Sequence, residues 1–178
     1  MLEDGYAAVS SRRVAAKAGL KPQLVHYYFR TMDDVFLETL RRRAEQNLER
    51  YARALASERP LRPLWELTTD VRGTAITMEF AALANHRKAI RAEIARYADR
   101  FRQMQLDALT RVLDGAGISE DRWPPVVLLL AMTGISQVIA LEQTLGITTG
   151  HAETHAFIER RIVELEGEPV TAASPPPS

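Results

Sequence analysis

The sequence contains no cysteine, so neither a disulfide framework nor thiolate chemistry is available to this protein. It also lacks any run of Val, Ile and Thr bounded by hairpin turns, which argues against a β-sheet. A Gly-x-Ser-x-Gly elbow, a phosphate-cradling glycine-rich loop and a dinucleotide fingerprint are absent as well. We therefore expect an all-α protein that is not an enzyme. An enzyme with dispersed catalytic residues is the alternative, and it would have a cleft with perturbed titratable groups.

Acidic residues are absent from residues 10–30, although the formal net charge of the whole chain is zero. The segment holds five basic residues: Arg12, Arg13, Lys17, Lys21 and Arg30. One concentrated basic segment in a neutral protein indicates that this segment binds an anionic partner. The alternative is a helical hairpin whose basic residues only keep it soluble.

Two short helices and the start of a third are predicted here. Ser10 is expected to cap a helix that ends near Ala18, and Gly19 can adopt the left-handed conformation that lets the chain turn. Pro22 suits the first position of the next helix. Thr31 is expected to cap the third. In the second helix, Val25 and Phe29 form the predicted buried ridge.

The outer face of the second helix carries Gln23, His26, Tyr27 and Arg30 at helical spacing. Glutamine can pair with adenine, the neighbouring Leu24 can contact a thymine methyl, and tyrosine or arginine can reach phosphate oxygens. This layout predicts a helix-turn-helix DNA reader.

Residues 5–36, GYAAVSSRRVAAKAGLKPQLVHYYFRTMDDVF, resemble the N-terminal DNA-binding region of the tetracycline-repressor (TetR) family of bacterial transcriptional regulators. The resemblance implies that base or phosphate contacts fall on Arg12, Lys21, Gln23, Leu24, His26, Tyr27 and Tyr28. This chain has Lys21 where the family usually has a capping Ser or Thr, and Met32 where it often has Lys. The family also has a whole helix before the Gly5 position, so we expect an N-terminally clipped domain whose first helix is largely missing.

The rest of the chain predicts a helical regulatory and dimerisation domain. Residues 33–57 contain no Gly or Pro and read as one long helix, and further helices are expected near 63–71, 74–85, 87–113, 123–141 and 151–166. We expect the DNA-binding domain over 1–40, the ligand-binding and dimerisation domain over 41–167, and a disordered tail over 168–178.

Residues 123–141 contain no charged side chain, which raises the possibility of a membrane span. Polar interruptions and the lack of a basic anchor cluster at its flanks favour a buried helix covered in part by a partner subunit. We expect a homodimer, without membrane partners, through the last two helices. Its predicted interface is Leu128, Ile135, Ile139, His155, Ile158 and Ile162.

A small apolar effector is the expected ligand of the central helices. Its candidate pocket residues are Trp65, Met78, Phe80, Tyr97, Phe101, Met104, Met132 and Gln137. A stripe of aromatic and methionine side chains is also what an ordinary core looks like, so we expect about half of them to line a cavity.

His151 and His155 have the spacing at which two imidazoles can share a metal, with Glu153 nearby, but no third ligand follows at a matching distance. We expect no metal and no cofactor. The acidic N-terminus has no apolar stretch typical of a secretory signal, which favours the cytoplasm. The sequence thus predicts a cytoplasmic repressor that binds double-stranded operator DNA and is released by an effector. A helical dimeric scaffold or small-molecule binder without DNA binding is the alternative.

Overall fold

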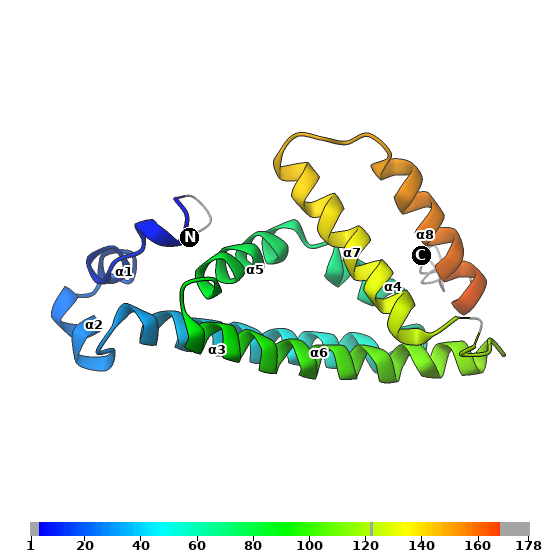
Figure 1. Cartoon of the computed structure of the whole chain (residues 1–178), viewed down its shortest axis with the longest axis horizontal. Coiled ribbons are helices and arrows are strands. Elements are labelled where there is room, and N and C mark those ends of the chain that lie inside the picture. Colours follow the sequence, from blue (N-terminus) through cyan, green and yellow to red (C-terminus); the bar gives the residue numbers. More distant parts are fainter. Residues whose placement is uncertain (1–3, 122, 168–178) are drawn as a thin grey trace, which may run out of the picture.

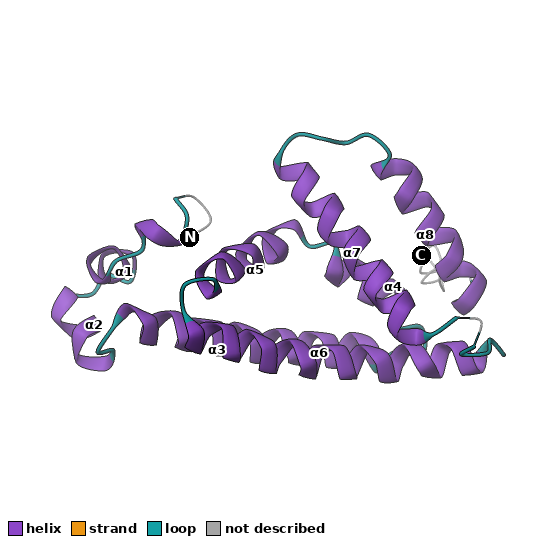
Figure 2. Cartoon of the chain, viewed as in Figure 1, coloured by secondary structure: helices purple, strands orange, loops and turns teal. Residues whose placement is uncertain are grey.

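The computed structural model describes residues 4–121 and 123–167. Within these residues the chain forms eight α-helices and one short 3-10 helix. Figure 2 shows no strand among the described residues. The prediction of an all-α protein is confirmed. The tail predicted over 168–178 lies outside the described residues.

The helices follow the predicted order closely. They are η1 (Tyr6–Ala8), α1 (Ser11–Lys17), α2 (Pro22–Tyr28), α3 (Met32–Leu55), α4 (Leu61–Thr68), α5 (Val71–Ala84), α6 (Lys88–Gly115), α7 (Pro125–Thr144) and α8 (His151–Glu166). α4 begins two residues before its predicted start because Pro63 falls in its first turn, where a missing amide proton costs no helical hydrogen bond.

Local sequence signals account for the ends of the first helices. The Ser10 hydroxyl accepts a hydrogen bond from the Arg13 amide at 3.4 Å, and Gly19 has a φ of 67°. Pro22 occupies the first turn of α2. Thr31 and Asp34 form a reciprocal capping box, with the Asp34 amide 3.2 Å from the Thr31 hydroxyl.

Helices α3 and α6 lie side by side and run in the same direction along the length of the molecule (Figure 1). Ion pairs join them in register: Arg87 with Asp33 at 3.0 Å, Arg41 with Glu93 at 2.7 Å and Arg100 with Glu45 at 2.7 Å. We call the paired helices α3 and α6 the α3–α6 base. The α1–α2 pair lies at one end of it, and α7 and α8 lie toward the other. α3 therefore connects the two ends of the molecule.

The largest apolar cluster joins α4, α6, α7 and α8. Its buried members are Leu61, Trp65, Leu109, Leu113, Leu129, Ile139, Ile158 and Ile162. At one edge of it the Leu61 amide, at the start of α4, donates to the Glu166 carboxylate at 2.7 Å. The end of α8 thus supplies a cap that α4 lacks in its own sequence.

A second cluster joins the two predicted domains. Buried Phe36 of α3 packs with Phe80 and Ile90, of α5 and α6, and Tyr6 and Val9 pack against the same group. Full burial of each large apolar side chain is worth about 1.5–3 kcal/mol. The N-terminal segment and helices α3, α5 and α6 therefore share one continuous core at this junction.

Candidate functional site

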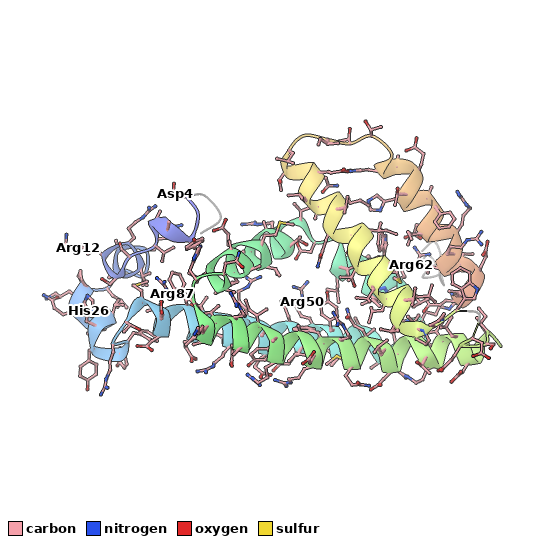
Figure 3. The ribbon with its side chains drawn as sticks, viewed as in Figure 1. Asp4, Arg12, His26, Arg50, Arg62 and Arg87 are labelled. Atoms are coloured by element: carbon pink, nitrogen blue, oxygen red, sulfur yellow. The ribbon has the colours of Figure 1, made fainter. Side chains whose placement is uncertain are left out.

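The α1–α2 pair presents a polar and aromatic face at the end of the molecule. All seven residues proposed for DNA contact are exposed, led by Tyr27 at 81% and Tyr28 at 71%. Figure 3 shows Arg12 on α1 and His26 on α2 at this end, away from α7 and α8. A duplex could reach this face without displacing another element.

The two helices are held together by a small contact. Ala15 and Val25 are buried between them, and Phe29 is half-buried at the end of α2. The His26 Nε2 atom lies 3.1 Å from the Ser11 hydroxyl, which connects α2 to the first turn of α1. This contact orients His26, so its ring helps to position the helix as well as lying on the exposed face.

The basic residues of this end differ in their surroundings. Arg13 pairs with Asp4 and also donates to the Ala8 carbonyl at 3.2 Å, so it ties the N-terminal segment to α1. Arg12, Lys21 and Arg30 are exposed. Lys21 is the N-cap residue of α2, and its exposed ammonium group is of the kind that contacts phosphate oxygens.

A cavity of about 330 Å³ lies among α3, α5, α6 and α7. Of the eight residues predicted for an effector pocket, Phe101 and Gln137 line it. Trp65, Phe80 and Tyr97 do not line it, because they are buried in the core. Met104 and Met132 pack against core clusters, and Met78 is half-buried on α5 outside the lining.

Tyr97 illustrates why the predicted stripe was misleading. Its hydroxyl donates to the Glu45 carboxylate at 2.9 Å, and its ring lies 4.2 Å from the Arg96 guanidinium. The side chain therefore joins α6 to α3, and no part of it is left to orient a ligand.

The cavity is lined mainly by polar residues. Each helix contributes a row at helical spacing: Arg43, Asn47, Arg50 and Tyr51 from α3; Thr74 and Thr77 from α5; Phe101, Arg102 and Gln105 from α6; Thr133, Ser136 and Gln137 from α7. Each row alone resembles a solvated helix face, so the sequence did not reveal these residues as the lining of a cavity. Only the packing shows that the rows meet.

Two groups in the wall are unusually enclosed. Burial raises the pKa of Tyr51 to about 12, so the phenol keeps its proton and can donate a hydrogen bond. Its ring meets Phe101 edge-on at 5.3 Å between centroids. Gln105 is 9% exposed, and among the described residues no side chain or backbone group hydrogen-bonds its amide.

Most residues predicted for a dimer interface lie in or against the core of the single chain. Ile139, Ile158 and Ile162 are buried within the single chain, and Leu128 and Ile135 pack against the same cluster. His155 is half-buried with its ring edge-on to Trp65 at 5.5 Å. These side chains therefore contribute to the core of the protomer, and their assignment to an interface stays a prediction.

A different face of α7 is exposed. We call it the α7 stripe: Val127, Ala131, Gly134, Val138, Leu141 and Leu145. Steps of three and four residues place all six on one side of the helix. By length and composition α7 could cross a membrane, and 22% of its most apolar window is buried. Its opposite side packs on α4, α5 and α6, so the α7 stripe is the part left without a partner in one chain.

The two C-terminal histidines have separate partners. His151 Nε2 lies 2.7 Å from the Glu142 carboxylate, which spans the gap between α7 and α8. Within residues 4–121 and 123–167, no group of three or more His, Asp or Glu side chains has the arrangement of a metal site.

Comparison with known proteins gives one match. Residues 1–39 match the family model described as bacterial regulatory proteins, tetR family. No curated protein and no solved structure matches the chain. The match covers η1, α1, α2 and the first turns of α3, which is the part that carries the exposed polar face.

Proposed function

The N-terminal part of this chain is that of a bacterial regulatory protein of the tetR family, and from this premise we propose that the protein is a homodimeric repressor released from operator DNA by a small molecule. DNA-binding transcriptional regulation follows from the family. Repression, dimerisation and the effector are the steps that we add. We also propose the cytoplasm as its location, because that is where operator DNA lies in bacteria.

The exposed face of α1 and α2 supports the DNA contact. We propose that Gln23 and Leu24 read base edges, that Arg12, Lys21, Tyr27 and Tyr28 hold the phosphate backbone, and that His26 supports α2 from Ser11. One reader helix contacts few base pairs, so specific binding needs two readers about one DNA turn apart.

The α7 stripe supports the dimer. A contiguous apolar face on a helix whose other side is already packed favours a second copy of the chain as its cover. Ala131 and Gly134 have little or no side chain at the middle of the α7 stripe, which permits close approach of two helices. We propose that α7, with the exposed Phe157 of α8, forms the two-fold interface.

The position of the cavity supports release by a ligand. α3 supplies Arg43 and Arg50 to its wall and begins directly after α2, so one helix about 36 Å long joins the two sites. A ligand that binds one arrangement of α3 better than another shifts the spacing of the reader helices. The boundaries near residue 40 and residue 167 remain our proposal for the two domains.

The alternatives are a helical scaffold without DNA binding and an enzyme. The cavity lining includes a single carboxylate, Asp70, whose Oδ1 accepts from the Arg72 amide at 3.1 Å as the cap of α5. A direct measurement of duplex affinity distinguishes the scaffold hypothesis from the regulator hypothesis.

The test begins with selection of binding sites from a random duplex library, followed by titration of the enriched sequence. We expect Gln23→Ala to cost about 1–3 kcal/mol at one base position. Arg12→Ala should weaken binding to all sequences and reduce the salt slope by about 1. Arg42→Ala, exposed on α3 outside the assigned face, is the matched control and should bind as the parent does. A library that yields no enriched sequence would contradict the proposal and favour the scaffold.

A further inference from the structure

The charge of the central cavity points to a particular class of ligand. Three arginines line it, Arg43, Arg50 and Arg102, against the one carboxylate of Asp70. Arginine stays protonated at any physiological pH, so the wall carries a fixed positive charge. Asp70 caps α5, which limits its use as a partner for these arginines.

These arginines differ from their neighbours on the same helices. Arg41, Arg96 and Arg100 each pair with a glutamate at 2.7–2.8 Å. Among the described residues, no carboxylate forms an ion pair with the three cavity arginines. Figure 3 shows Arg50 in the space bounded by α5, α7 and the α3–α6 base. The arginines that pair with glutamates and the arginines that line the cavity are therefore separate sets.

The neutral part of the wall suits a polar head joined to an apolar body. Gln105 offers an amide without a protein partner, and Tyr51 offers a protonated hydroxyl. Phe101, Leu129 and Leu130 supply apolar surface beside them. A volume of about 330 Å³ lies at the lower end of the range for ligand sites, so the body must be small.

We infer that the effector is a small organic carboxylate, held by Arg43, Arg50 and Arg102 at its charged end and by Phe101, Leu129 and Leu130 along its body. The inference rests on the proposed function and replaces the apolar effector expected from the sequence. Planar guanidinium groups bind a carboxylate through two parallel hydrogen bonds, whereas a neutral amide of the same shape offers one acceptor oxygen and no charge. Arg50 and Arg102 are accessible to solvent and can meet the anion as it enters, whereas Arg43 is half-buried.

The test compares pairs of probes that differ in charge and little in shape: benzoate with benzamide, and hexanoate with hexanamide. Inorganic phosphate is a third arm. Binding to the full chain is measured by calorimetry at fixed ionic strength. We expect at least one carboxylate to bind about tenfold or more tightly than its amide, and more tightly than phosphate. Equal binding of acid and amide, binding of phosphate alone, or no binding of either carboxylate at millimolar concentration would overturn the inference.

Variants locate the site. Arg43→Gln and Arg102→Gln should each weaken the carboxylate about tenfold. Arg43→Lys, which keeps the charge, should lose less than Arg43→Gln. Arg42→Gln, exposed on α3 outside the lining, should lose nothing. Unchanged binding in both cavity variants would overturn the assignment, and their melting temperatures show whether they fold.

A separate readout distinguishes this inference from the proposed function. If a carboxylate binds through these arginines and leaves duplex affinity unchanged, the anion site stands and the release mechanism fails. If the carboxylate lowers duplex affinity in the parent and not in Arg43→Gln, the anion site and the release mechanism are both supported.

Discussion

Several charged side chains of α3 and α6 hold these two helices together. Glu93 of α6 accepts hydrogen bonds from Arg96 in its own helix and from Arg41 in α3, at 2.8 and 2.7 Å. Both guanidinium groups favour the ionised carboxylate, and they lower the pKa of Glu93 to about 2, with Arg96 the larger cause. One carboxylate thus binds both an intrahelical and an interhelical partner.

This arrangement predicts a pH dependence of stability. Because the pKa of Glu93 is lower in the folded state than its ordinary value of 4.5, the folded protein binds fewer protons there than the unfolded chain. The stability from Glu93 is therefore complete above about pH 4.5 and is lost as the pH falls toward 2. Glu93→Gln should be less stable than the parent in urea at pH 7, and the difference should shrink as the pH is lowered through this window.

The control for this prediction is Glu49→Gln, a glutamate exposed on α3. Its difference in unfolding free energy from the parent should be small at pH 7. A stability difference for Glu93→Gln that stays constant between pH 7 and pH 3 would contradict the role assigned to the ion pairs.

At the scale of the element, α7 has two apolar faces, of which one is buried and the other is exposed. Neighbouring residues divide between them: Ile139 is 5% exposed and Val138 is 53% exposed. The inner face meets the core shared with α4, α6 and α8, and the α7 stripe remains outside. The same substitution therefore reaches the protomer core on the inner face and the exposed surface on the α7 stripe.

We predict that Val138→Glu and Leu141→Glu give folded monomers, because a charge at the centre of an apolar interface is desolvated without a partner. Ile139→Glu should instead fail to fold, since it buries the charge in the protomer core. Sedimentation velocity gives the oligomeric state, and circular dichroism gives the helix content. A parent protein that sediments as a monomer at micromolar concentration, or a Val138→Glu protein that remains a dimer, would refute the interface.

At the scale of the whole molecule, the reader is connected to the regulatory helices by two routes. The first is the length of α3. The second is α5, whose Glu79 carboxylate accepts from the Tyr6 amide at 2.7 Å beside the cluster around Phe36 and Phe80. α5 also supplies Thr74 and Thr77 to the cavity wall, so both routes begin at the cavity.

This connection predicts that a residue far from the DNA face affects DNA affinity. Glu79→Ala removes the bond to the N-terminal segment and should weaken duplex binding by about 1 kcal/mol, roughly fivefold. Glu79→Gln keeps a carbonyl oxygen that can accept from the same amide, and it should bind nearly as the parent does. The measurement is fluorescence anisotropy on the selected duplex. Equal affinity of the parent and Glu79→Ala would limit the connection to α3.

Local sequence signals were sufficient to predict the helix-turn-helix formed by α1 and α2. Ser10, Pro22 and Thr31 each act within a few residues of themselves, through a cap, a fixed φ or a reciprocal hydrogen bond. For this reason the starts of α1, α2 and α3 and the exposed face of α2 could be predicted before the fold was known. The all-helical architecture followed in the same way from periodicity and from residues that end helices.

The exposed face of α7 and the cavity could not be predicted in this way. α7 is apolar around most of its circumference, so its sequence gives no single face that must point inward, and the packing of α4, α5 and α6 placed Ile139 inside and Val138 outside. The cavity arises from rows of polar residues on separate helices, each of which alone resembles a solvated face. Arg43 and Arg102, 59 positions apart in the sequence, share one wall only because α3 and α6 lie side by side. Caps and turns are local interactions that the sequence determines, whereas the choice of an inward face and the meeting of distant charges depend on how the helices pack.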